Sequence, residues 1–369
     1  MATKFRDYFF YKDKNLSNTD TLLIDINLVD PISYIVVEME VQNYASVVPD
    51  HDLADYIKSI EIIDGSEVIE SLDMKGWIAL NFFENGILPA YSHSEVSGAT
   101  ITQTCIIPFG RYKDDLNFYF NPAVFRNPQL KIDVAFSDIG SGHFATGTVK
   151  ATVKARCIME GYNDYEGFLS TKEIYSFTSG ASGEELINLP RDYPYRSMLI
   201  KALKTEVRPY AILSRLKLSC DAGRYIERDS YMTDIIESNQ SNIGLAQYRK
   251  RVDGGHNVTA LSMIYDALMA SVSVVDTDYI ASIEAITAEK ITYTTYNMTT
   301  PGTPAFGATG TLCDVIVQGN CPYGHIYIPF GNSVDSDAWF NPSDYGSVEL
   351  ALTQAAAGDC GVIVQQLRT

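Results

Sequence analysis

Hydrophobic and polar residues alternate along much of this chain, with the period of two that marks a β-strand with one buried face. Between residues 37 and 42, Val, Met and Val alternate with Glu, Glu and Gln, and a longer alternation runs from Val149 to Cys157. Further apolar runs, separated by turn-forming Gly, Asn, Asp and Pro, lie at residues 22–29, 60–63, 314–317 and 361–364. The pattern predicts an all-β chain.

Helical signals are few, which favours β-sandwiches or barrels. Residues 71–85 and 229–248 could each hold a short helix, and residues 261–270 fit a helix or a strand equally well. A length of 369 residues suggests two domains at about 150 residues each. The likeliest boundary is 176–185, where Gly180, Ser182 and Gly183 interrupt the pattern. We therefore expect domains at 1–175 and 185–369.

A motif occurs twice in the same order: Ile-Pro-Phe-Gly, then Phe-Asn-Pro, then an aromatic residue and an alternating strand. Two such matches at nearly the same spacing arise by chance with odds of about 10⁻⁴. The first copy comprises Pro108, Phe109, Gly110, Phe120, Asn121, Pro122 and Phe125, and the second Pro329, Phe330, Gly331, Phe340, Asn341, Pro342 and Tyr345.

Both copies of the motif have the same physical interpretation. The first proline ends a strand because it lacks the ladder donor, and the glycine lets the chain turn. Asn-Pro is favoured at the start of a helix, so each copy should open one helical turn, with Phe125 or Tyr345 packing inward.

A fainter match joins 60–62, Gly65 and 69–70 to 216–218, Gly223 and 226–227. Two tandem copies of one β-domain explain all of these matches, provided that the second copy carries an insertion at about 245–320.

A duplicated β-sandwich of jelly-roll size that repeats this motif resembles the double jelly-roll major capsid proteins of tailless icosahedral viruses with an internal membrane. The stretch Asn-Pro-Gln-Leu-Lys-Ile at 127–132 looks like the helix-to-strand junction of bacterial and archaeal members. The resemblance implies two upright eight-stranded jelly rolls, and homotrimers that form pseudo-hexagonal capsomers. It also implies contacts with neighbouring capsomers and with minor capsid or penton proteins, location in the virion, and assembly in the host cytoplasm.

Charge and composition limit the other possible partners. The 46 acidic residues against 28 Lys and Arg give a net charge of −18, which disfavours extensive direct binding to nucleic acid. No apolar run reaches the ~18 residues of a membrane span, so we expect a soluble, intracellularly made chain. Six cysteines without C-x-x-C spacing indicate free thiols.

Catalytic and metal-binding signatures are scarce. There is no H-E-x-x-H, G-x-S-x-G or Walker sequence, and Cys321 with His325 supplies only two of the four ligands of a closed zinc site. We therefore expect no enzyme activity, catalytic residues, cofactor or metal. The alternative is a carbohydrate-binding or glycan-degrading β-sandwich, because 24 tyrosines and 16 phenylalanines could stack on sugars and the many acids could form catalytic pairs.

The N-terminal 14 residues combine basic and aromatic side chains. Lys4, Arg6, Lys12 and Lys14 against two aspartates give this segment a net charge of +2. Basic residues are attracted to anionic lipid and aromatic rings favour the membrane interface, so the segment suits contact with an internal membrane. The alternative is that its aromatics pack under a neighbouring subunit or the first jelly roll.

Overall fold

The computed structural model describes residues 3–44, 52–94, 96, 98–136, 144–253, 258–275, 279–297, 305–306 and 312–369. Strands dominate it, as the alternating pattern predicts. In β3 (Ile32–Gln42) the apolar positions Ile35, Val37, Met39 and Val41 are buried while the intervening residues are partly exposed. The all-β fold class is confirmed.

The first half is a sandwich of two antiparallel sheets, here called the first roll. One sheet has the order β1-β9-β3-β7-β6, and the other contains β2-β8-β4-β5. Besides β3, the strands are β1 (Lys4–Asn15), β2 (Thr19–Asp25), β4 (Ile57–Asp64), β5 (Glu67–Leu72), β6 (Tyr91–Ser92), β7 (Thr100–Pro108), β8 (Pro128–Ala135) and β9 (Lys150–Glu160).

The second half, here called the second roll, repeats this arrangement. Its sheets contain β10-β24-β12-β22 and β11-β23-β13-β14. The strands are β10 (Phe168–Ser179), β11 (Glu184–Asn188), β12 (Tyr195–Leu203), β13 (Leu213–Cys220), β14 (Tyr225–Tyr231), β22 (His325–Pro329), β23 (Val348–Gln354) and β24 (Gly358–Arg368). Strand for strand, β1-β9-β3-β7 corresponds to β10-β24-β12-β22, and β2-β8-β4-β5 to β11-β23-β13-β14. The two rolls share one topology.

The two rolls are joined edge to edge. Strand β5 of the first roll and β10 of the second are neighbours in one continuous eight-stranded sheet. Because β10 pairs along its length with β24, Phe168 already belongs to the second roll. We therefore place the division between the rolls at residues 161–167, ahead of the boundary at 176–185 suggested by the glycines.

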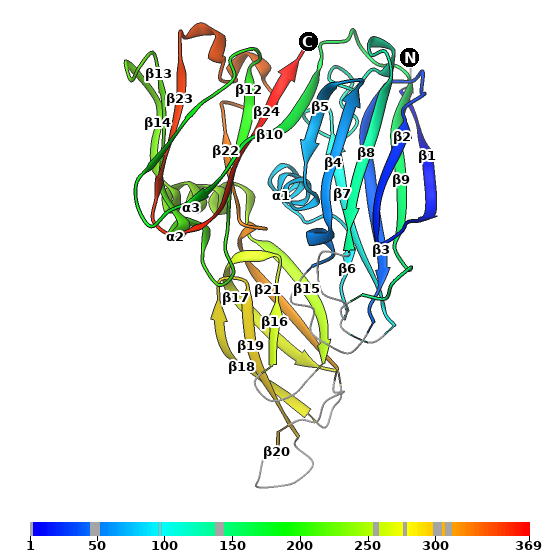
Figure 1. Cartoon of the computed structure of the whole chain (residues 1–369), viewed down its shortest axis with the longest axis vertical. Helices are drawn as coiled ribbons and strands as arrows, with labels where there is room; N and C mark the ends of the chain where they lie inside the picture. Colours follow the sequence, from blue (N-terminus) through cyan, green and yellow to red (C-terminus); the bar gives the residue numbers. More distant parts are fainter. Residues whose placement is uncertain are drawn as a thin grey trace.

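Short helices lie at the ends and between the rolls. Helix α1 (Met74–Asn85) begins where the Asp73 carboxylate accepts a hydrogen bond from the Gly76 N–H (2.7 Å), and it ends at Gly86, whose φ of 73° is left-handed. It lies between the two rolls (Figure 1). The others are α2 (Pro209–Ile212) and α3 (Met232–Ile243), with short 3₁₀ helices at Leu53–Tyr56, Pro122–Val124, Ser336–Ala338 and Pro342–Asp344.

The connection between α3 and β22 forms a separate small β-domain, here called the insertion. Its strands are β15 (Ala246–Asp253), β16 (Val258–Leu261), β17 (Ile264–Val274), β18 (Tyr279–Thr287), β19 (Lys290–Asn297), β20 (Ala305–Phe306) and β21 (Leu312–Pro322). The ambiguous segment 261–270 is thus mostly strand, because β17 pairs with β21. The insertion docks on the first roll through the Arg251 N–H, which donates to the His93 carbonyl (3.1 Å).

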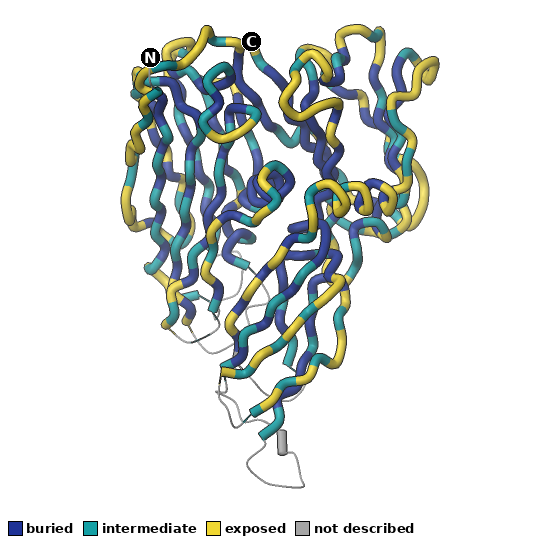
Figure 2. Tube along the Cα trace, turned by 180° about the vertical axis from the view of Figure 1, so that it is seen from behind, coloured by how far each residue is buried: buried dark blue, intermediate teal, exposed yellow. Residues whose placement is uncertain are grey.

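The two ends of the molecule's long axis are formed by different parts of the chain. The chain ends lie together at one end, here called the terminal end, and the insertion extends from the other (Figure 1). Both rolls stand upright with the same polarity, because β1 and β10 both start at the terminal end. Buried positions alternate with more exposed ones along strands such as β3 and β8, whereas β12 and β24 of the second roll are buried almost continuously (Figure 2).

Candidate functional site

The two copies of the repeated motif occupy equivalent places at the terminal end. Strand β7 ends at Pro108 opposite Tyr34, and β22 ends at Pro329 opposite Ser197. Beyond each turn the backbone of Phe120 pairs with Ile32, with N···O distances of 2.8 and 2.9 Å. The backbone of Phe340 pairs in the same way with Tyr195, at 2.8 and 3.2 Å.

Each Asn-Pro pair opens one turn of 3₁₀ helix. The Asn121 side chain accepts from the Ala123 N–H (3.1 Å), and the Asn341 side chain accepts from the Ser343 N–H (3.4 Å). Asn is a favoured N-cap and Pro is tolerated at the first helical position, where no donor is needed. Residues 121–130 and 341–350 have the same burial class position by position.

Aromatic rings of the motif stack on one another in both copies. The Phe120 and Phe125 ring centroids are 4.7 Å apart, and those of Phe340 and Tyr345 are 5.9 Å apart. The motif's first phenylalanine, Phe109 or Phe330, packs on the same stack. Phe125 and Tyr345 are half-buried, so each covers the end of its sandwich and does not fill its centre.

The two motif glycines are required by close approach of the loop that follows. A Cβ on Gly110 would lie 2.6 Å from the Asp115 Cβ. Gly331 has a φ of +61°, and a Cβ there would collide with the Ala338 carbonyl. Contacts under 3.0 Å force a shift, so a side chain at either position would displace its loop.

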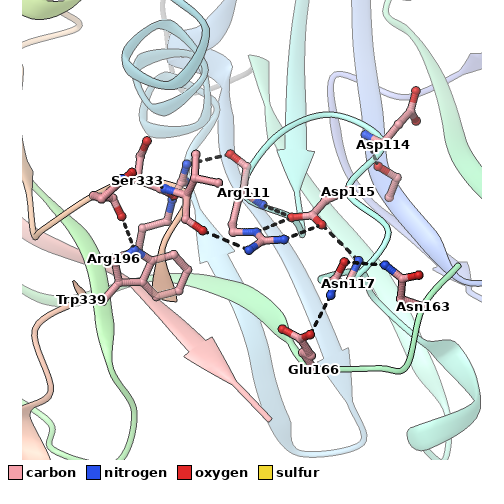
Figure 3. Close-up of polar contacts among 12 residues, drawn as sticks. Arg111, Asp114, Asp115, Asn117, Asn163, Glu166, Arg196, Ser333 and Trp339 are labelled. Carbon is pink, nitrogen blue, oxygen red and sulfur yellow. Dashed lines mark hydrogen bonds and ion pairs between the residues drawn. The ribbon is translucent and has the colours of Figure 1, made fainter. Parts of the chain in front are cut away.

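The loops between the glycine and the second phenylalanine of each motif copy, residues 111–119 and 332–339, meet at the contact between the rolls, here called the seam (Figure 3). The Arg111 guanidinium makes a bidentate pair with Asp115 at 2.7 and 3.0 Å. Its Nη1 donates across the seam to the Val334 carbonyl (3.0 Å) of the second roll. The Phe118 ring, which lies under the same guanidinium at 4.3 Å, packs against Trp339.

A second arginine, Arg196, crosses the seam from β12 and is almost fully buried. It is ion-paired with Glu84 of α1 and donates to the Gln365 side chain (2.9 Å). It also donates to the carbonyls of Ser333 (3.1 Å) and Arg111 (2.8 Å), so it binds both loops at once. A buried charge with this many partners fixes the relative position of the rolls.

Further along the seam, β5 and β10 approach as parallel neighbours at Ser71 and Lys172. The Glu70 carboxylate is fully buried there and accepts from the Thr171 N–H (2.6 Å). Burial raises the pKa of Glu70 well above its usual range, outweighing that hydrogen bond and the nearby cations.

His325 is fully buried at the start of β22, and neither of its ring nitrogens has a hydrogen-bond partner. Two charged groups act on it, Asp73 at the start of α1 and Lys201 on β12, which lie 3.4 Å apart across the seam. Burial lowers the pKa of His325 to about 4, and the Asp73 carboxylate offsets this only in part. His325 is therefore neutral at pH 7.

A cavity of about 520 Å³ lies between the first roll and the insertion, lined by Asp52, His93 and Tyr265 among others. His93 is engaged on both nitrogens, by the Tyr248 hydroxyl (2.6 Å) and the Gln103 side-chain oxygen (2.7 Å). No cluster of three or more His, Cys, Asp or Glu that could hold a metal ion occurs among the described residues. Cys321 and His325, the two possible ligands in the sequence, are both buried.

The basic residues of the N-terminal segment do not form one patch. Strand β1 pairs with β9, so Lys4 and Lys14 lie about 33 Å apart at the usual strand rise. Lys4 is paired with Glu160 (2.8 Å) and Arg6 with Asp30 (2.6 Å) at the terminal end. Tyr8 and Phe9 are exposed, whereas Phe10 and Tyr11 pack against the first roll's core. Residues 4–15 form an edge strand and not a free tail.

Sequence patterns did not reveal the seam residues Arg196, Glu84 and Gln365. Arg196 lies in the apolar stretch of β12, where neighbouring residues are buried, and a charge in such a run is the one signal that could have found it.

Among the described residues, none of the helices has the length and apolar character that a membrane span requires.

Comparison with known proteins gives structural matches only. No family model matches the sequence, and no curated protein matches it significantly. The alignment with the STIV MCP crystal structure covers 99% of this chain and 97% of the STIV MCP chain, at a TM-score of 0.59 and 9% identity. The major capsid protein P2 from bacteriophage PM2 matches 99% and 98%, at a TM-score of 0.54 and 10% identity. A chain in the structure of Sulfolobus Turreted Icosahedral Virus matches 99% and 91%, at a TM-score of 0.60 and 10% identity.

These likenesses span both rolls and the insertion, and they agree with the duplicated strand order and the repeated motif. The chain has the double jelly-roll fold of viral major capsid proteins.

Proposed function

We propose that this protein is the major capsid subunit of an icosahedral virus and acts by packing and assembly, without catalysis. The observation that carries the proposal is the fold: two upright rolls of one topology and one polarity, locked by a buried polar seam. The matched structures include two major capsid proteins and a chain of an icosahedral virus, each of nearly the same extent, with 91–98% of their chains covered.

The proposed assembly unit is a homotrimer that meets neighbouring capsomers and minor capsid or penton proteins in the shell. Three copies of a chain with two similar rolls give a ring of six similar units, and such a ring tiles an icosahedral surface. We propose the virion as the site of function and the host cytoplasm as the site of assembly. The net charge of −18 argues against an extensive direct role in binding the genome.

We also propose that the terminal end faces any internal lipid membrane. The loops at this end carry exposed large hydrophobic side chains that could enter lipid. They are Val29, Tyr112, Val124, Tyr162 and Val334. Lys4 and Arg6 lie at the same end, whereas Lys12 and Lys14 lie toward the insertion. The proposed lipid contact therefore rests on these loops more than on the N-terminal strand.

Sedimentation equilibrium of the purified chain tests the assembly unit. A subunit of 40.9 kDa predicts a species of 3 × 40.9 kDa. A strictly monomeric or dimeric protein at micromolar concentration would contradict the proposal.

A further inference from the structure

Six strands of the two rolls, β1, β2, β6, β11, β14 and β22, lie at sheet edges without an outer neighbour among the described residues, and two of these edges are considered together here. Strand β14 is the outer strand of its sheet in the second roll, and β1 is the outer strand of its sheet in the first. Both carry exposed large side chains, Ile226 and Tyr231 on β14 and Tyr8 and Phe9 on β1. An unpaired edge with exposed aromatics invites pairing with another chain.

The seam shows how two such edges join. There β5, the outer strand of the first roll's second sheet, meets β10, the outer strand of the second roll's first sheet. In the duplicated topology β14 is the counterpart of β5, and β1 is the counterpart of β10. The subunit therefore contains one completed junction of this type and the two unused halves of a second.

Strand pairing fixes the correspondence between β5 and β14. Ile62 on β4 pairs with Glu70, and the equivalent Leu218 on β13 pairs with Arg228. The register shifts immediately after these pairs in both rolls, so the alignment is not ambiguous. Glu70 thus corresponds to Arg228 and Ser71 to Asp229, one residue away from the match suggested by sequence alone.

Strand pairing also aligns β10 with β1. Lys172 pairs with Val364 of β24, and Tyr8 pairs with Ala155 of β9. Val364 and Ala155 are themselves equivalent, because each lies two pairs beyond the register shift at the start of β12 or β3. Both strands also skip one residue at the same place, Ile174 in β10 and Phe10 in β1. Lys172 therefore corresponds to Tyr8, and Thr171 to Asp7.

We propose that β14 of one subunit joins β1 of the next in the register of the seam, placing Asp229 opposite Tyr8 and Arg228 beside Asp7. This deepens the proposed capsid function and rests on it. The contact is head-to-tail, and a head-to-tail contact gives a closed ring when three successive rotations return to the first subunit. Three subunits then give six rolls with six similar junctions, three within subunits and three between them.

Charge supports this pairing. Strand β1 has a net charge of +2, from Lys4, Arg6, Lys12 and Lys14 against Asp7 and Asp13. Strand β14 and α3 together have a net charge of −3, from Glu227, Asp229, Asp234 and Glu237 against Arg228. Opposite potentials favour association and fix register. The pairing also gives the basic and aromatic N-terminal strand β1 a role in assembly.

Arg228 provides a further observation. Its Nη1 is buried and has no hydrogen-bond partner within the subunit, and burial lowers the pKa of its guanidinium. At the equivalent seam position Glu70 receives a hydrogen bond from the adjacent strand at Thr171. In the proposed contact Asp7 takes the place of Thr171 and supplies the acceptor that Arg228 lacks.

Cysteine crosslinking tests the register. The double variant Tyr8→Cys/Asp229→Cys should form disulfides between subunits, seen as covalent dimers and trimers on non-reducing gels. The six native cysteines are all buried and should not interfere. Ser71→Cys/Lys172→Cys is the matched control, because these residues are neighbours within one chain and should crosslink without changing its mass. Tyr8→Cys/Leu186→Cys uses the opposite edge of the sheet, β11, and should not crosslink.

Sedimentation of the same samples separates this inference from the proposed function. A trimer in which Tyr8 and Asp229 fail to crosslink, while the Ser71–Lys172 control succeeds, would overturn the edge pairing and leave the capsid function standing. A trimer that crosslinks better through Leu186 would also overturn it. A protein that never forms trimers would overturn both.

Discussion

At the scale of single residues, the seam contains ionisable groups held in their neutral or paired forms by burial. His325 is the clearest, since both ring nitrogens are buried without hydrogen-bond partners. A histidine whose folded pKa is about 4, below the 6.5 of the exposed side chain, takes up a proton more readily when the protein unfolds. It therefore stabilises the fold above pH 6.5, and this contribution is lost as the pH falls toward 4.

We predict that His325→Leu flattens the pH dependence of stability between pH 6.5 and 4. In the wild-type protein, the lowered pKa of His325 should reduce the free energy of unfolding by about 3 kcal/mol as the pH falls from 6.5 to 4, at about 1.4 kcal/mol per pKa unit. Urea unfolding of both proteins at several pH values measures this, with pH 8 as the reference at which neither titrates. Parallel curves for the two proteins would show that His325 is not responsible.

At the scale of elements, the sequence predicted the positions of two helices as well as the many strands. The helix signal at 71–85 corresponds to α1, and that at 229–248 contains α3, because Asp73 caps the first and apolar residues recur at helical spacing in the second. The segment 261–270 resisted prediction because its strand identity depends on pairing with β21, about 50 residues away in sequence. The same limit applies to β1, whose pairing with β9 sequence composition could not reveal.

The repeated motif predicts that equivalent substitutions in its two copies have similar effects on stability. Phe125→Ala and Tyr345→Ala should each lower the free energy of unfolding by about 2 kcal/mol, less than for a fully buried ring because both are half-buried. The two losses should be similar, since each ring stacks on an equivalent phenylalanine. Thermal melts of both variants measure this, with exposed Val124→Ala as the control. No change in either melt would show that these rings do not cover the sandwiches.

At the scale of the whole molecule, the seam decides whether two rolls behave as one unit. Its residues come from α1, β12, β24 and two loops, so they are far apart in sequence and no local pattern brings them together. Sequence repetition predicts two similar rolls, but it carries no information on how they meet. The insertion adds a second tie, because it leaves the second roll and docks on the first.

We predict that Arg196→Met lowers the free energy of unfolding by about 3–5 kcal/mol, because it leaves Glu84 buried without its cation. The double variant Glu84→Met/Arg196→Met should lose less than the sum of the two single changes. Lys4→Met, which removes an exposed ion pair with Glu160, is the control and should cost less than about 1 kcal/mol. Strictly additive losses at Glu84 and Arg196 in denaturant titrations would contradict a coupled seam.

The orientation of the subunit relative to lipid makes a further prediction. Val29→Asp/Val124→Asp should weaken co-sedimentation of assembled protein with anionic vesicles, because it places charge on apolar loops at the terminal end. Ile280→Asp, on the insertion at the opposite end, is the matched control and should have no effect. Equal vesicle binding by all three proteins would remove the terminal end as the lipid-facing surface.

Cryo-electron microscopy of the purified protein, viewed down its long axis, can distinguish a trimeric capsomer from other assemblies. We expect three-fold particles in which six sandwiches form a closed ring, with the three insertions on one side and all chain ends on the other. Particles containing a single pair of sandwiches, or two subunits related by a two-fold axis, would contradict this expectation.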